Sequence, residues 1–169
     1  KLLPDSFAKM LHEFMLARGR AASPMVMYGE SLWDSNIFLV AKYFNKLSPS
    51  LGRMPSHQAM IIDRELQKQF KFDSQLALYA DLDFKIRLYN SGVNFERFPL
   101  PVCVAEAGGV SQNFSTMKAL KSRTNETYYL MRKNYNFLWG IIYSSVFFVW
   151  NFRKLITYYF QLAILFPTL

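Results

Sequence analysis

Two aspartates, Asp81 and Asp83, are the residues of this sequence best suited to chemistry, because they stand where a helix is expected to begin. A carboxylate there can accept hydrogen bonds from the backbone N–H groups of the first turn and so cap the helix. The same carboxylate can act as a general base if it reaches a substrate hydroxyl. An Asp-x-Asp pair before a helix is more often a cap than a base, so the pair alone leaves both roles open.

The elements that must hold these acids alternate between helices and short strands along the chain. Hydrophobic spacing and turn residues predict helices over residues 4–18, 64–69, 81–90 and 115–135, and strands over residues 25–28, 57–62 and 93–104. The segment 37–44 fits either a strand or a short helix. This alternation predicts an α/β domain, yet the strands are too few for a complete doubly wound sheet.

Local signals set several boundaries of these elements. Gly29 and Glu30 are expected to end the first strand, and Asp63 is expected to cap the helix that follows it. Ser91 and Gly92 should end the helix that carries the acid pair. Two prolines, Pro99 and Pro101, should confine the last segment to a sheet edge or to an irregular strand, because proline cannot donate to a central ladder.

Positive charge is concentrated in the last third of the 169 residues. Residues 1–116 hold 13 Lys and Arg against 11 Asp and Glu, a net +2, whereas residues 117–169 hold seven against Glu126 alone, a net +6. Nucleic-acid binding would require stacking rings in a polar setting. Here the rings lie within apolar runs, so the composition favours an anionic membrane surface and argues against a nucleic-acid partner.

From Phe137 onward the chain is strongly apolar, and only Arg153 and Lys154 interrupt it. Each uncharged run is shorter than the ~20 residues of a membrane-spanning helix. Trp139, Trp150 and their tyrosine neighbours are side chains that favour the boundary of a membrane. We expect this tail, residues 136–169, to attach to a membrane peripherally or as a shallow hairpin anchor. A helix pair packed on protein is the alternative.

The single cysteine, Cys103, excludes an intrachain disulfide and fits a reducing compartment. No signal-peptide pattern follows Lys1. Because the chain opens directly into a helix without an initiator Met, we expect it to begin inside a longer protein.

Four short signatures occur in a fixed order: Pro55-Ser56-His57-Gln58, Phe70-Lys71-Phe72-Asp73, Ala80-Asp81-Leu82-Asp83 with Arg87-Leu88, and Gly108-Gly109-Val110-Ser111. Together they resemble the acceptor half of an inverting family-two glycosyltransferase with the GT-A fold. The resemblance covers about residues 1–135, and its specificity rests on the order and spacing of the signatures. It implies an incomplete GT-A fold that lacks the N-terminal nucleotide-binding half and is followed by apolar helices.

The resemblance also implies roles for individual residues. Asp81 matches the catalytic base, which takes the proton of an acceptor hydroxyl; Ala80 departs from the Glu of many members. The residues expected to bind acceptor or to support its site are His57, Gln58, Asp83, Arg87, Gly109 and Ser111. For Asp83 a structural role is favoured, with Arg87 as its i,i+4 partner.

The intact enzyme would transfer a hexose-type sugar from a nucleotide-diphosphate donor to a polysaccharide or lipid-linked acceptor, on the cytoplasmic face of a membrane. The resemblance places the Mg²⁺ or Mn²⁺ of such an enzyme at a separate donor Asp-x-Asp motif in the N-terminal half, and it does not assign that role to Asp81-Leu82-Asp83. We therefore expect no metal site here and no activity from this chain alone. The alternative hypothesis is a non-catalytic, membrane-associated interaction domain or the remnant of a transferase.

Overall fold

The computed structural model describes residues 1–169 except 34–35, 38–43, 106–115 and 166–169. The chain divides into two compact units, one formed by Lys1–Gln75 with Ala80–Ala107 and the other by Leu76–Tyr79 with Gly108–Leu169. Sequence analysis expected a boundary after residue 135; in the structure the helix before that point belongs with the helix after it. Each unit is described separately below.

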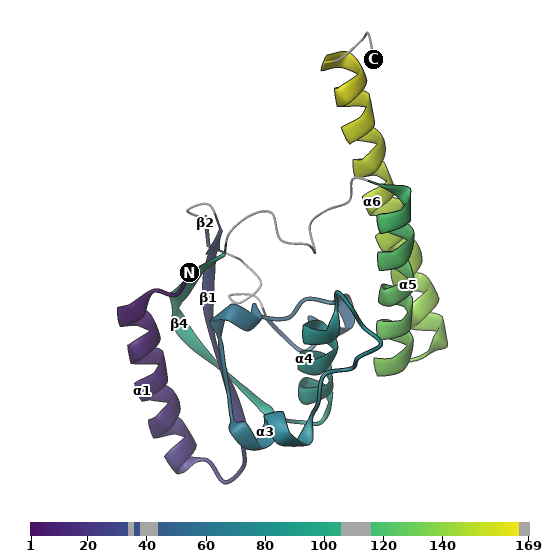
Figure 1. Ribbon diagram of the computed structural model, residues 1–169. Coiled ribbons are helices and arrows are strands. Elements are labelled where there is room, and N and C mark those ends of the chain that lie inside the picture. The colour runs from purple at the N-terminus through teal and green to yellow at the C-terminus, as the bar shows by residue number, and fades with distance from the viewer. Residues whose placement is uncertain (34–35, 38–43, 106–115, 166–169) are drawn as a thin grey trace. The chain divides into compact units, whose positions relative to one another are not determined.

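The first unit is an α/β structure built on a mixed sheet. Strand β1 (Met25–Trp33) is central: β2 (Asn36–Ile37) and β3 (Met60–Ile62) pair with it antiparallel, and β4 (Asn94–Ala105) pairs with it in parallel (Figure 1). Leu2 also makes an isolated bridge to Cys103 of β4. As a named strand β4 pairs only with β1, as its two prolines predicted.

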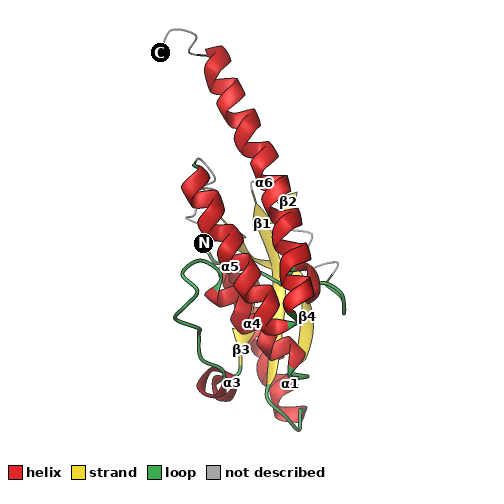
Figure 2. Cartoon of the chain, turned by 90° about the vertical axis from the view of Figure 1, so that its right-hand side faces the viewer, coloured by secondary structure: helices red, strands yellow, loops and turns green. Residues whose placement is uncertain are grey.

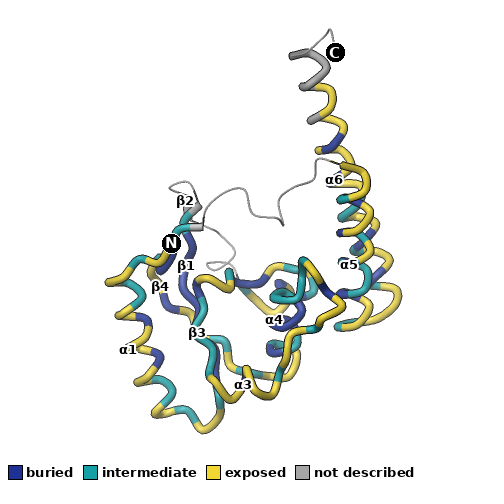
Figure 3. Tube along the Cα trace, viewed as in Figure 1, coloured by how far each residue is buried: buried dark blue, intermediate teal, exposed yellow. Residues whose placement is uncertain are grey.

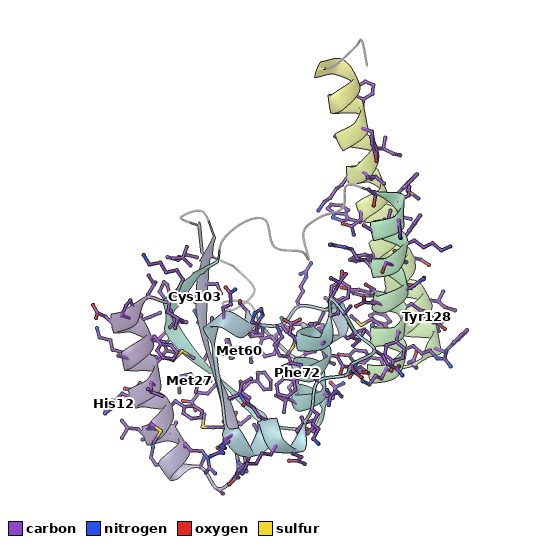
Figure 4. The ribbon with its side chains drawn as sticks, in the orientation of Figure 1. His12, Met27, Met60, Phe72, Cys103 and Tyr128 are labelled. Atoms are coloured by element: carbon purple, nitrogen blue, oxygen red, sulfur yellow. The ribbon has the colours of Figure 1, made fainter. Side chains whose placement is uncertain are left out.

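Alternation along β1 supplies two hydrophobic layers, because neighbouring side chains of a strand point to opposite faces. Met25 and Met27 pack with Met10 and Phe14 of α1 (Pro4–Arg20), on the side where Figure 4 marks Met27 and Cys103. Val26 packs on the other face, in a cluster completed by Leu66, Phe84 and Leu88. These three come from α3 (Arg64–Gln69) and α4 (Ala80–Asn90), which cover that face of the sheet.

The first strand is longer than predicted, since β1 continues through Gly29 to Trp33. A Cβ at Gly29 would lie 2.7 Å from Val102 Cγ2 and 3.2 Å from the Leu100 carbonyl oxygen. The strand register shifts at this point, between Tyr28 and Ser31. Gly29 therefore permits a close approach of β4 and does not end the strand.

The segment predicted as a strand over residues 57–62 is divided in two. His57–Ala59 form a 3-10 turn, η2, and only Met60–Ile62 are extended as β3. A second short turn, η1 (Pro49–Leu51), lies in the predicted loop before it. The helix boundaries agree better: Asp63 accepts the Glu65 N–H as the cap of α3, and Gly92, at φ 82°, follows α4.

The second unit contains two long helices, α5 (Met117–Asn134) and α6 (Phe137–Leu165), which pack along each other (Figure 2). Thr116 caps α5 by accepting the Ala119 N–H, close to the predicted start at residue 115. Helix α6 continues without a break through Arg153 and Lys154, the two cations that interrupt the apolar sequence. Within the described residues, none of the helices combines the length and hydropathy needed to cross a bilayer.

Candidate functional site

Helix α4 places Asp81 at its second position, in the first turn. The body of the helix is fixed because Phe84 and Leu88 are buried against the sheet. The side chain of Asp81 is 39% exposed, whereas that of Asp83, two residues on, is fully buried. The two acids therefore lie in different environments, and of the two only Asp81 is accessible to a ligand.

Two nitrogen atoms approach the same carboxylate oxygen of Asp81. His57 Nδ1 lies 3.1 Å from Oδ2, and Lys85 Nζ donates a hydrogen bond to it over 3.3 Å. Lys85 also donates to the Pro55 carbonyl oxygen at 3.1 Å. The ammonium group thus connects α4 to the segment that carries His57, and it fixes the carboxylate in the process.

The Lys85 side chain is only 6% exposed, which is rare for an ammonium group. Burial lowers its pKa because the charged form is poorly solvated, and the nearby Asp81 carboxylate raises it in part. The net effect is a lowered pKa. Perturbed titratable groups of this kind cluster at functional sites, although structural pairs show them as well.

A cavity of about 330 Å³ lies beside this cluster, and Asp81, His57 and Lys85 are among its polar lining residues. This volume is within the ~300–1,000 Å³ typical of small-molecule sites. The remaining lining residues are Ile62, Gln67, Phe70, Lys71, Phe72 and Phe84. Phe72, marked in Figure 4, is 64% exposed and packs against Phe84 with ring centroids 4.9 Å apart. The cavity therefore combines one carboxylate, three basic side chains and aromatic rings.

Asp83 and Arg87 form the expected i,i+4 pair, with Arg87 Nε donating to Asp83 Oδ2 at 2.7 Å. Arg87 also donates to the Lys71 carbonyl oxygen. Neither residue lines the cavity. The pair instead connects α4 to the loop that carries Phe72, so the structure places both residues in a supporting position.

The remaining predicted residues are not gathered at the cavity. Gln58 is exposed on η2 but is not among the lining residues. Gly109 and Ser111 lie outside the described residues.

Lys85 and Phe72 are the site residues that sequence analysis missed. The i,i+4 spacing of Asp81 and Lys85 signals their contact. The sequence holds no comparable signal for the Pro55 carbonyl, because its approach to Lys85 depends on the fold.

A second hollow of about 660 Å³ lies elsewhere in the first unit. Four aromatic rings contribute to it, those of Tyr28, Phe44, Tyr89 and Phe95, and they contact one another edge to face or tilted. Burial raises the pKa of the Tyr28 hydroxyl, so it stays protonated at neutral pH. Among the described residues, none that lines this hollow is a carboxylate.

Across the part of the chain that the structure describes, no three His, Cys, Asp or Glu side chains gather as a metal site requires. Comparison with known proteins adds no assignment: no family model, no curated protein and no solved structure matches this chain.

Proposed function

We propose that this chain is the acceptor-binding part of an inverting glycosyltransferase with a GT-A fold. The observation that carries the proposal is the setting of Asp81, a partly exposed carboxylate on the wall of a cavity, held by His57 and Lys85. The order of the signatures around residues 55–58, 70–73 and 80–88 supports it independently. Both lines point to the same residue as the base.

In this mechanism the acceptor is an alcohol of a saccharide or lipid-linked saccharide bound in the cavity. We assign proton acceptance to Asp81 Oδ1, since the contacts from His57 and Lys85 both use Oδ2. As the hydroxyl oxygen forms its bond to the anomeric carbon, the bond from that carbon to the nucleotide diphosphate breaks. The acceptor proton passes to Oδ1, and direct displacement inverts the configuration at the anomeric carbon.

Other residues of the cavity have positioning roles in this proposal. Phe72 offers an exposed ring to the apolar face of a sugar, as aromatic side chains do in small-molecule sites. Lys85 holds the Asp81 carboxylate with one hydrogen bond and is itself fixed by a second one, to the Pro55 carbonyl oxygen. Fixing the base before the acceptor binds reduces the reorganisation needed during transfer.

The donor and its divalent cation are assigned to a segment outside residues 1–169. The resemblance places Mg²⁺ or Mn²⁺ at the diphosphate, where it would stabilise the leaving group. No role proposed here needs a metal ligand from this chain. We therefore propose that catalysis requires the longer protein that includes the donor-binding half.

The configuration of the product tests the reaction class. The longer protein is incubated with α-linked uridine and guanosine diphosphate hexoses and with alkyl glycosides as acceptors. Proton NMR of the anomeric signal should show a β-linked product. An α-linked product would exclude direct displacement of the diphosphate by the acceptor hydroxyl, with Asp81 as the base. A protein that attaches to membranes but turns over none of these donors would support the non-catalytic alternative.

A further inference from the structure

The α5–α6 hairpin buries apolar side chains, Leu120, Leu130, Met131 and Leu155, together with small and polar ones, and it leaves further large apolar side chains of α6 exposed. On α6 the buried positions include Gly140, Ser144 and Asn151. Gly140 is needed there, since an added Cβ would lie 3.0 Å from Arg132 Cβ and 3.2 Å from its backbone nitrogen. Ser144 and Asn151 donate hydrogen bonds to backbone carbonyl oxygens of their own helix. The contact between the helices thus relies on close approach.

The opposite face of α6 carries exposed apolar side chains. Figure 3 shows that long stretches of this helix are exposed. At helical spacing it presents Leu138, Ile142, Val146, Val149, Trp150, Ile156 and Phe160. Val146 is 65% exposed and Trp150 is 60% exposed. In a helix pair that is surrounded by water, each helix normally buries such residues against the other helix. A contiguous row of large exposed apolar side chains marks a surface that contacts a membrane or another protein.

Cations are placed within and beside this face. Arg153 lines a shallow groove with Val146, Val149 and Trp150, and Lys154 Nζ lies 5.7 Å from the centroid of the Trp150 ring. Their stems can lie along apolar surface while the charged ends reach lipid phosphates. The exposed cations of α5 are Lys118, Lys121, Arg132 and Lys133.

We propose that the outward face of α6, defined by Ile142, Val146, Val149, Trp150 and Arg153, binds the surface of an anionic lipid bilayer. The helix lies in the plane of the membrane, with Trp150 at the boundary between headgroups and acyl chains and with Arg153 and Lys154 at the phosphates. This surface is independent of the Asp81 cavity, so either proposal can fail without the other.

Charge favours lipid over a second copy of the chain as the occupant of this face. Residues 117–169 carry seven Lys and Arg and one acid, Glu126. Glu126 already accepts the Leu78 N–H at 2.9 Å. Two copies meeting through α6 would bring like charges together, whereas anionic lipid attracts them.

Co-sedimentation of the 169-residue chain with vesicles tests the proposal. The chain should bind equimolar phosphatidylcholine and phosphatidylglycerol vesicles, and high salt should weaken the binding. The double variant Arg153→Gln/Lys154→Gln should bind on the order of 30-fold more weakly. The variant Val149→Ser/Trp150→Ser should also lose binding, while its circular dichroism stays unchanged because both side chains are exposed.

A matched variant separates this surface from general charge attraction. Lys9→Gln/Lys68→Gln removes the same charge from exposed positions of the first unit, on α1 and α3, and should bind as the wild type does. Equal losses in the two charge variants would overturn the proposal. It would also be overturned if vesicles failed to bind while sedimentation showed dimers that the Val149→Ser/Trp150→Ser variant abolishes.

Discussion

At the scale of single residues, the geometry around Asp81 is set by Lys85. Its buried ammonium group hydrogen-bonds both the Asp81 carboxylate and the Pro55 carbonyl. A buried charge persists at such a position only when it is partnered, since its desolvation is costly. Burying the Lys85 ammonium group costs solvation free energy, and the result is an Asp81 carboxylate in a fixed position. Such an arrangement is expected if Asp81 acts as a base.

Lys85→Met should change how the free energy of unfolding depends on pH. Burial lowers the pKa of Lys85 in the folded state, so between that pKa and ~10.4 the unfolded chain binds more protons. The wild type therefore gains stability as pH rises through this window, relative to a variant without the lysine. Urea unfolding at several alkaline pH values measures the difference.

The matched control is Lys68→Met on α3, where the lysine is exposed. If Lys85→Met and Lys68→Met behaved alike, the lysine would not be held in the buried position described above.

At the scale of elements, helix α3 depends on an acid whose environment predicts an acid-sensitive contribution. Burial raises the pKa of Asp63, but hydrogen bonds from the Glu65 N–H and from Arg18 outweigh this effect and leave the pKa lowered. A lowered folded pKa means that the unfolded state binds more protons below ~3.9. The stabilisation is thus complete above that pH and is lost as pH falls through the folded pKa.

Asp63→Asn should therefore flatten the loss of stability in acid. The amide can still cap α3 but does not titrate. Unfolding by urea from about pH 5 downward should show the wild type losing stability faster than the variant in this range. Asp5→Asn, which changes an exposed acid in the first turn of α1, is the matched control. Parallel curves for wild type and Asp63→Asn would contradict the account.

Two glycines, one in strand β1 and one in helix α1, differ in the space around them and give a second prediction. Gly29→Ala should destabilise the chain by about 1–3 kcal/mol, because its Cβ would lie 2.7 Å from Val102 Cγ2. Gly19→Ala, in α1 with nothing within 4 Å of its Cβ, should stabilise it by about 0.5–1 kcal/mol. Midpoints of urea unfolding measure both. A neutral Gly29→Ala would show that β1 and β4 do not approach closely at that point.

These elements also show which parts of the fold could be predicted. The caps of α3 and α5 and the glycine after α4 are local, so a few neighbouring residues define them. The length of β1 is not local: it extends past Gly29 because β4, about 70 residues later, pairs with it. The turn at His57 and the continuity of α6 also depended on packing that no short motif encodes.

The same distinction applies to the site. Asp81 was identified by its position before a helix and by the neighbouring signatures, and the pairing of Asp83 with Arg87 followed from spacing. The roles of Lys85 and Phe72 could not be predicted, because both depend on a cavity that exists only in the folded chain. Phe72 and Lys85 line that cavity although they come from a loop and from α4, and Lys85 reaches the Pro55 carbonyl oxygen only in the folded chain.

At the scale of the whole molecule, the two proposals belong to different compact units. The Asp81 cavity is formed entirely within the first unit, and the apolar face of α6 belongs entirely to the second. The second unit also carries most of the net positive charge. This division suits an enzyme whose acceptor lies at a membrane, since one unit would bind lipid while the other performs transfer.

The most direct test of the central claim is the turnover of Asp81→Asn in the longer protein, at saturating donor and acceptor. Asp5→Asn is the matched control, because Asp5 is also the second residue of its helix. Asp5 is exposed, and it is distant in the sequence from the residues that line the cavity. We expect Asp81→Asn to lower kcat by about 10²–10⁴ with donor affinity unchanged, and Asp5→Asn to leave both unchanged. A kcat for Asp81→Asn close to that of Asp5→Asn would show that Asp81 is not the base.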